Sequence, residues 1–213
     1  MSNLFKRIIT SIFLLTIIIG CLLYHKYLWL SLLVIVSVIS FYEFNILIKK
    51  IYKKNIKIMN LINIIVLLYL LFFIYTSYLI GANSFELTLF ILSICILSDT
   101  GGYIVGKTFG GKKLTKISPN KTISGSIGSF VFSMFPLTVY NYYEFNLLYF
   151  IIFIFLLSLI SQCGDLLISY FKRKAKVKDT GSILPGHGGI LDRIDGIIFA
   201  VPAAFILINL IKL

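Results

Sequence analysis

Seven apolar segments separated by short polar stretches constrain this chain more than any other feature of its sequence. The segments are Ile8–Tyr24, Tyr27–Ile48, Ile58–Ile80, Phe85–Ser98, Ile127–Tyr140, Leu147–Phe171 and Ile194–Ile211. About 20 helical residues, each rising about 1.5 Å, cross a hydrocarbon core of about 30 Å. The fourth and fifth segments are shorter than this. We expect the fourth to continue past Asp99 through Tyr103, and the fifth either to begin before Ile127 or to tilt little.

These segments are predicted to be helices although they are rich in isoleucine. In lipid, backbone polar groups have to be satisfied within their own segment, which overrides the strand preference of β-branched residues. Charged residues make up only 13% of the chain and the mean hydropathy is +0.98, whereas soluble domains carry about 25% charged residues. The sequence therefore predicts an all-α, polytopic transmembrane bundle of about seven to eight spans.

The basic residues indicate which side each loop occupies. The net charge of +12 is also typical of nucleic-acid-binding proteins, but here the lysines and arginines lie in short clusters between apolar segments. If the N-terminus is cytoplasmic, 18 of the 20 basic residues lie on the inner side, leaving only Lys26 and Lys212 outside. We therefore expect a multi-pass protein of the cell inner (plasma) membrane with no nucleic-acid partner. Its long polar stretches, Gly106–Gly125 and Lys172–Arg193, would face the cytoplasm.

The three cysteines do not indicate a disulfide framework or a metal site. Cys21, Cys95 and Cys163 all lie inside apolar segments. The run Ile18–Cys21 resembles a lipoprotein cleavage site, but apolar sequence continues beyond it. We therefore expect Ile8–Tyr24 to be the first membrane helix and not a removed signal.

Asp165 is the most informative acidic residue. It lies seven residues before Lys172, which corresponds to about 10 Å of helix and places it inside the bilayer boundary. A charge at the bilayer centre costs about 2.5–3.5 kcal/mol on insertion scales and less near the interface. Two explanations remain open: Asp165 pairs with a lysine to hold the bundle together, or it is functional, which we favour.

Asp192 and Asp195 are three residues apart and are predicted to share one face at the start of the last helix. Aspartate at a helix start is often a cap, but one carboxylate suffices for capping. Two, with Asp165 nearby, would suit a hard cation such as Mg²⁺, which prefers oxygen ligands.

The glycine-rich stretches have two interpretations. Gly102, Gly106 and Gly110 are spaced four apart, a stripe that favours close helix packing in membranes. A phosphate-binding loop is rejected there, because Lys113 follows Lys112 where Ser or Thr is required. Farther along, the glycines around His187 allow backbone to approach a ligand closely.

Three stretches of the sequence resemble a known family. The first runs from Ser169 to Asp195 and reads Ser169-x-x-Lys172-Arg173, Lys178-Asp179-x-Gly181, and Leu184-Pro185-x-His187-Gly188-Gly189-Ile190-x-Asp192-Arg193-Ile194-Asp195. The second comprises Asp99–Tyr103, Gly106, Phe109-Gly110 and Ser118–Thr122, and the third is Gly164-Asp165. Together they cover roughly residues 95–200 and resemble phosphatidate cytidylyltransferases. Ser124 departs from the family, which usually has glutamate there.

The resemblance implies a reaction in which CTP and phosphatidate give CDP-diacylglycerol and pyrophosphate. It also implies Mg²⁺, a monovalent cation such as K⁺ as a further candidate, and a homodimer. Residues 1–84 would form N-terminal transmembrane helices and residues 85–213 the catalytic transmembrane region. In-line attack by a phosphate oxygen needs no protein nucleophile, so catalysis would rest on positioning and charge stabilisation.

Candidate site residues follow from this chemistry. Asp165 and Asp192 are predicted metal ligands, with Asp195 supporting them and Lys121 as a fourth catalytic candidate. The predicted substrate-binding residues are Lys172, Arg173, Arg193, Ser169, His187, Gly188, Gly189 and Asp99. A loop histidine such as His187 is more often structural than a proton carrier.

Two other functions remain as alternatives. A CTP-dependent polyprenol or phytol kinase-like enzyme would release CDP in place of pyrophosphate. A transporter would fit an intramembrane aspartate and glycine-rich segments. It would leave the stretch Ser169–Asp195 unexplained. The carboxylates of that stretch are also not spread along a path across the bilayer.

Overall fold

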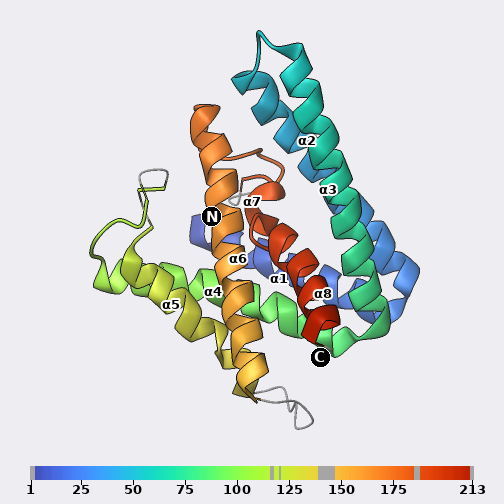
Figure 1. Cartoon of the computed structure of the whole chain (residues 1–213), viewed down its shortest axis with the longest axis vertical. Helices are drawn as coiled ribbons and strands as arrows, with labels where there is room; N and C mark the ends of the chain where they lie inside the picture. Colours follow the sequence, from blue (N-terminus) through green and yellow to red (C-terminus); the bar gives the residue numbers. More distant parts are fainter. Residues whose placement is uncertain (1–2, 116–117, 120, 139–146, 185–187, 212–213) are drawn as a thin grey trace. The chain divides into compact units, whose positions relative to one another are not determined.

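The structure is a computed structural model that describes residues 3–115, 118–119, 121–138, 147–184 and 188–211. Within these ranges the chain is helical, and two isolated β-bridges are the only strand-like pairings. The elements are α1 (Asn3–Tyr24), α2 (Lys26–Ile51), α3 (Ile56–Asn83), α4 (Phe85–Phe109), α5 (Ile123–Ser133), η1 (Phe135–Thr138), α6 (Leu147–Lys174), α7 (Leu191–Ile194) and α8 (Ile197–Ile211). Figure 1 labels α1 to α8. The predicted all-α class is confirmed.

Four of the described helices are long and apolar enough to cross a membrane, namely α2, α3, α4 and α6. Shorter apolar helical stretches cover Ile9–Tyr24 and Ile123–Thr138. These lengths and compositions support a membrane protein with several spans. The number of seven to eight spans and the cytoplasmic orientation stay predictions.

Some helix ends agree with the sequence and others differ. Helix α4 continues past Asp99 to Phe109, as expected. Helix α5 begins at Ile123, which fits one of the two alternatives for that segment, but it ends at Ser133 and the 3₁₀ helix η1 follows. The last apolar segment is not one helix from Asp192 onward, because α7 ends at Ile194 and α8 begins at Ile197. The backbone N–H of Gly196 donates to Asp195 Oδ1 at 3.0 Å, so this aspartate occupies the turn between the two helices. The expectation that Asp192 and Asp195 share one helix face is therefore wrong.

The described chain forms two compact units. The first comprises Met1–Phe85 with Phe171–Ile194, and the second comprises Glu86–Tyr170 with Asp195–Leu213. One boundary, between Phe85 and Glu86, lies one residue after the division at residue 84 that the sequence suggests. That division concerns function, so it stays a prediction.

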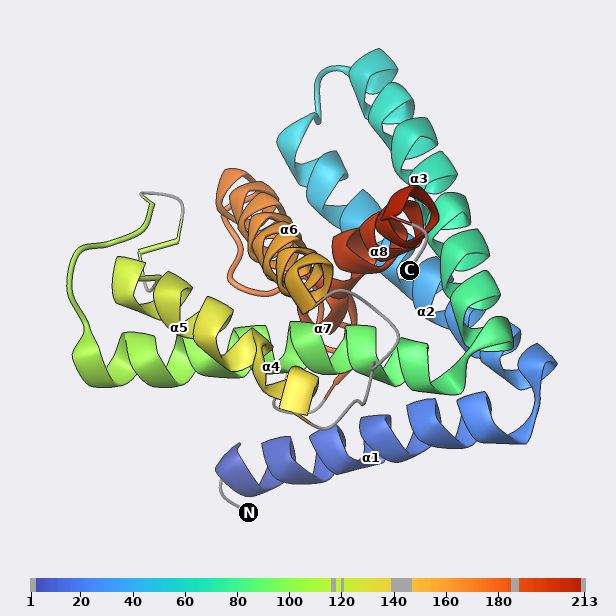
Figure 2. The same ribbon diagram turned by 60° about the horizontal axis from the view of Figure 1, so that its bottom comes forward.

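In the first unit, α2 and α3 lie side by side, as both Figure 1 and Figure 2 show. The indole Nε1 of Trp29 donates to the Ser77 carbonyl at 3.0 Å in the buried contact between them. Gly81 permits this approach, because a Cβ there would lie 2.8 Å from Trp29 Cδ1. Small residues thus let the two helices come close, as is common in membrane bundles.

In the second unit, buried polar groups join α4, α5 and α6. The hydroxyls of Ser98 and Ser158 lie 2.8 Å apart, and Gln162 Nε2 donates to Ser158 Oγ at 3.3 Å. Ser126 Oγ in turn donates to Gln162 Oε1 at 2.6 Å. Hydrogen bonds between helices satisfy polar side chains that lipid could not.

The predicted glycine stripe is confirmed as a packing surface for two of its three members. A Cβ on Gly102 would lie 2.5 Å from Ser129 Oγ, and one on Gly106 would lie 3.4 Å from the Cα of Gly125 on α5. Gly110 has no such neighbour and instead adopts φ +57°, which ends α4 in a conformation that glycine tolerates best.

Candidate active site

Lys121 is held by the backbone immediately before α5. Leu114 donates its N–H to the Lys121 carbonyl at 2.8 Å, within the short pairing of Lys113 with Thr122. Thr122 is the N-cap of α5, and its hydroxyl accepts the N–H of Gly125 at 3.0 Å. The sequence Lys-Thr thus fixes a lysine next to a helix start.

The ammonium of Lys121 pairs with Asp165 Oδ2 within the second unit. The other carboxylate oxygen, Asp165 Oδ1, accepts from Ser169 Oγ one helical turn later at 3.3 Å. The Lys121 and Asp165 side chains are 27% and 24% exposed, so the pair is open to solvent. The lysine pairing that the sequence left open for Asp165 is therefore present, and its partner is itself a predicted phosphate-binding residue.

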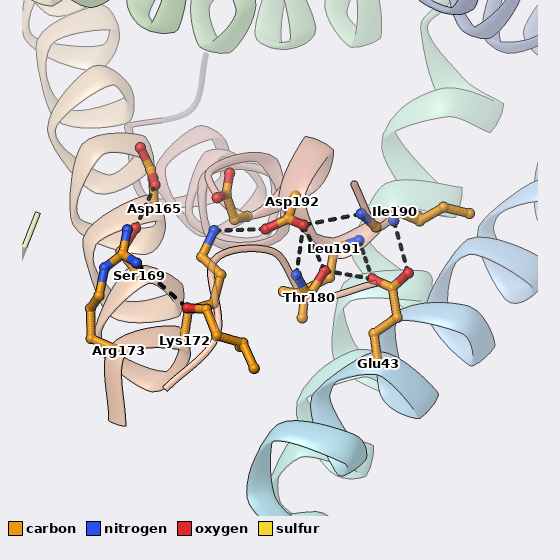
Figure 3. Close-up of polar contacts among 12 residues, drawn as sticks. Glu43, Asp165, Ser169, Lys172, Arg173, Thr180, Ile190, Leu191 and Asp192 are labelled. Atoms are coloured by element: carbon orange, nitrogen blue, oxygen red, sulfur yellow. Dashed lines mark hydrogen bonds and ion pairs between the residues drawn. The ribbon is translucent and has the colours of Figure 1, made fainter. Parts of the chain in front are cut away.

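A second, more deeply buried pair joins Lys172 at the end of α6 to Asp192 in α7, within the first unit. Lys172 Nζ lies 2.7 Å from Asp192 Oδ1, and the side chains are only 11% and 4% exposed. Asp192 Oδ2 accepts three further hydrogen bonds, from Thr180 N at 2.8 Å, Thr180 Oγ1 at 3.0 Å and Gly189 N at 3.0 Å. Figure 3 shows these contacts converging on the Asp192 carboxylate.

These donors lower the pKa of the Asp192 carboxyl below its ordinary value. Burial alone would raise this pKa, because it disfavours the charged form. The hydrogen bonds from Lys172 and from the N–H groups of Thr180 and Gly189, with the positive charge of Lys172, outweigh burial. Asp192 therefore remains an anion at neutral pH.

Glu43 on α2 belongs to the same cluster, although sequence reasoning gave it no role beyond its place near the inner end of the second helix. Its side chain is 1% exposed, and it accepts hydrogen bonds from Thr180, Ile190 and Leu191 (Figure 3). The signal that would have found it is the one applied to Asp165, an acidic residue inside an apolar helix.

The glycines near Asp192 allow close approach of backbone to protein groups, and their predicted approach to a ligand stays a prediction. Gly188 has φ +81°, and a Cβ on it would lie 2.8 Å from Asp192 Oδ2. A Cβ on Gly189 would collide with Glu43 Oε2 and Thr180 Oγ1. His187 lies outside the described residues.

The remaining predicted residues are less enclosed or differently placed. Arg173 is exposed and donates from Nη1 to the Val177 carbonyl at 3.5 Å. Arg193 and Asp99 are also exposed, on α7 and α4 respectively. Asp195 is 7% exposed and accepts from Gly196 in the second unit, whereas Asp192 belongs to the first.

Ser124, which stands where the family usually has glutamate, has a local structural role. Its hydroxyl donates to the Gly110 carbonyl and lies 3.0 Å from Thr122 Oγ1. The hydroxyl thus ties the start of α5 to the turn after α4.

Among the residues that the structure describes, no cluster of three or more His, Cys, Asp or Glu side chains could by itself hold a metal ion. Asp165 Oδ2 and Asp192 Oδ1 each face a lysine ammonium. A carboxylate oxygen of this kind is a suitable Mg²⁺ ligand if the lysine gives way to the cation. Asp192 Oδ2 already accepts three hydrogen bonds and is not available.

The fold defines a class, an all-helical protein with several apolar helices long enough to cross a membrane, and its described residues include two lysine–carboxylate pairs. Comparison with known proteins specifies the family. The model of the cytidylyltransferase family matches residues 45–211, so the chain belongs to this family.

Relatives named phosphatidate cytidylyltransferase occur in several bacteria. The chain is 45% identical over 124 residues to the protein of Staphylococcus saprophyticus, covering 56% of this chain and 48% of that one. It is 48% identical over 124 residues to the protein of Staphylococcus aureus strain COL, with the same coverage, and 46% identical over 127 residues to that of Rickettsia typhi, covering 54% and 56%. The chain spans about half the length of the curated relatives it matches.

Proposed function

We propose that the protein transfers the cytidylyl group of CTP to phosphatidate, giving CDP-diacylglycerol and pyrophosphate. The observation that carries this proposal is the family match over residues 45–211, which includes both lysine–carboxylate pairs. The identity of 45–48% to phosphatidate cytidylyltransferases over more than half of the chain supports the same reaction.

The charged residues suit this reaction for an electrostatic reason. Two anionic phosphorylated substrates have to meet, and their repulsion is offset by cations and hydrogen-bond donors. Lys121 and Lys172 supply ammonium groups, and the exposed Arg173 and Arg193 can hold phosphate oxygens through two parallel bonds. The phosphatidate oxygen is itself the nucleophile, so the protein would contribute position and charge.

We propose Asp165 and Asp192 as the Mg²⁺ ligands, with Asp195 in support. This assignment rests on the sequence and on the two carboxylate oxygens that face lysines. When bound, Mg²⁺ would neutralise charge on phosphate oxygens and on the leaving pyrophosphate. Lys121 and Lys172, released from their carboxylates, would then be available to substrate phosphates. A monovalent cation such as K⁺ is a further candidate.

The lipid substrate and the apolar helices together support a location in the cell inner membrane. The basic clusters support a cytoplasmic active site, where CTP is available and the lipid tails remain in the bilayer. A homodimer is proposed from the family resemblance alone.

The proposal is tested with purified protein in detergent or vesicles, labelled CTP and phosphatidate, with and without Mg²⁺. We expect CDP-diacylglycerol and pyrophosphate to form in equal amounts and only when Mg²⁺ is present. Release of CDP with a phosphorylated lipid would identify a kinase and refute the proposal. Asp165→Asn and Asp192→Asn should abolish turnover, and near-full activity in either well-folded variant would refute its assignment as a ligand.

A further inference from the structure

Glu43 is a buried acid that neither the sequence motifs nor the proposed reaction employs. It lies two residues before the part of the chain that the family model matches. Its side chain is 1% exposed, on a helix whose other buried residues are mostly apolar. An acid so completely removed from solvent requires partners, and its partners indicate what it does.

Every hydrogen bond shown to Glu43 comes from the described residues 180–184 and 188–191, which are called the 180–191 stretch below. Oε2 accepts from Thr180 Oγ1 at 2.8 Å and from Leu191 N at 2.9 Å, and Oε1 accepts from Ile190 N at 3.0 Å. The two amides directly precede and begin α7, which carries Asp192. Glu43 thus satisfies N–H groups at a helix start that no intrahelical carbonyl can reach.

Thr180 joins Glu43 to Asp192. Its hydroxyl lies within hydrogen-bond distance of both carboxylates, 2.8 Å from Glu43 Oε2 and 3.0 Å from Asp192 Oδ2. Its backbone N–H also donates to Asp192 Oδ2. Because one hydroxyl serves both acids, displacement of Glu43 changes the donors available to Asp192.

Two glycines of the 180–191 stretch close around the Glu43 carboxyl group. A Cβ on Gly181 would lie 2.6 Å from Glu43 Oε1, and a Cβ on Gly189 would collide with Glu43 Oε2. The same Gly189 donates its N–H to Asp192 Oδ2 at 3.0 Å. The backbone at Gly189, which donates to Asp192, therefore packs directly against the Glu43 carboxyl group.

We propose that Glu43 is a positioning residue that fixes the 180–191 stretch and thereby orients the Asp192 carboxylate for the reaction. The claim that this orientation serves the reaction rests on the proposed cytidylyl transfer. The claim that Glu43 holds the 180–191 stretch in place does not. A residue of the N-terminal helices would thus control the geometry of a motif more than 130 residues later in the chain.

The first measurement is hydrogen–deuterium exchange on the full-length protein without CTP or added metal. Glu43→Gln keeps the size of the side chain but replaces one acceptor oxygen with an NH₂ group that faces donors. We expect the amides of Ile190 and Leu191 to exchange at least tenfold faster, with α3 and α4 unchanged. Glu86→Gln, the same chemical change at an exposed position on α4, is the matched control and should leave all rates unchanged.

The second measurement is steady-state kinetics at saturating Mg²⁺. For Glu43→Gln we expect kcat to fall at least tenfold while KM for CTP changes less than threefold. Thr180→Val removes only the shared hydroxyl, so it should lower kcat without loss of the fold. Thr180→Ser keeps a hydroxyl and should retain a kcat close to that of the wild type. This pair keeps the inference testable if Glu43→Gln does not fold.

The outcomes separate the two proposals. Unchanged exchange in Glu43→Gln would overturn the positioning role. Faster exchange with unchanged kcat, or full activity in Thr180→Val, would overturn the claim that this positioning serves the reaction. If the wild-type protein makes no CDP-diacylglycerol but the exchange rates rise as expected, cytidylyl transfer fails while Glu43 still fixes the 180–191 stretch.

Discussion

The ion pair between Lys172 and Asp192 should contribute more to stability than the pair between Lys121 and Asp165. The Lys172 and Asp192 side chains are 11% and 4% exposed, so loss of one partner leaves the other charge out of water. Removal of one member of a buried pair costs about 3–5 kcal/mol. We expect Lys172→Met to cost about 3 kcal/mol, near the lower limit, because Asp192 keeps its donors at Oδ2.

A double-mutant cycle measures the coupling within this pair. The variants are Lys172→Met, Asp192→Asn and both together, and the assay is thermal unfolding in detergent. For a chain of this length, about 3 kcal/mol corresponds to a fall in Tm of about 6–12 °C. The double variant should recover at least about 1.5 kcal/mol relative to the sum of the single changes, because it leaves no unpaired charge.

The quarter-exposed pair provides the matched control. Lys121 and Asp165 are 27% and 24% exposed, and solvent-exposed pairs couple by only about 0.2–1 kcal/mol. The same cycle with Lys121→Met and Asp165→Asn should therefore be nearly additive. If the Lys172–Asp192 cycle is additive within about 0.5 kcal/mol, the pair is not energetically coupled and the reasoning from burial is refuted.

Three further predictions follow from single contacts. First, the pKa of Asp192 is lowered in the folded protein, so the ionised Asp192 carboxylate stabilises the fold fully above the ordinary aspartate pKa of about 3.9, and this stabilisation is lost as pH falls through the lower folded-state pKa. Between pH 6 and pH 3, Tm should therefore fall more steeply for the wild type than for Asp192→Asn. Equal slopes would contradict this. Second, Lys121→Met should reduce CTP-dependent activity at least tenfold, which corresponds to about 1.4 kcal/mol, with little change in Tm. Lys113→Met, at an exposed lysine nearby, should retain activity. Similar activities of the two variants would exclude a special role for Lys121. Third, Gly189→Ala should destabilise the protein by about 1–3 kcal/mol in thermal unfolding, because the new Cβ would collide with Glu43 and Thr180. Gly20→Ala, where a Cβ has open space, should not destabilise the protein. Equal Tm values of the two variants would contradict the close packing around Gly189.

Part of the candidate site was proposed from residue type and local position, and part from the family resemblance. Asp165 stands out because a charged residue inside an apolar segment is costly and is usually paired or functional. Asp192 stands out with Asp195 as a pair of acids at a helix start, whereas Lys121 and Lys172 were assigned from the motifs that resemble the family. The structure places them in two pairs, Lys121 with Asp165 and Lys172 with Asp192. Which lysine meets which aspartate depends on tertiary packing, and no local pattern specifies it.

The amino-acid sequence alone determined the all-helical class and the approximate positions of the helices. In a membrane protein the backbone hydrogen bonds form within each helix, so long apolar segments are sufficient to define helices. The continuation of α4 beyond Asp99 and the early start of α5 follow the same local rule.

Only the tertiary structure decided the break at Asp195 and the role of Glu43. At the break, Gly196 packs closely against Ser161, a residue that is distant in the chain. The Glu43 carboxylate reaches donors 137 to 148 residues away, and such a pairing depends on which buried acceptor meets which unsatisfied N–H group once the helices have packed. Local sequence indicates which segments are helical, but some helix breaks and the partners of buried polar groups are determined only in the folded chain.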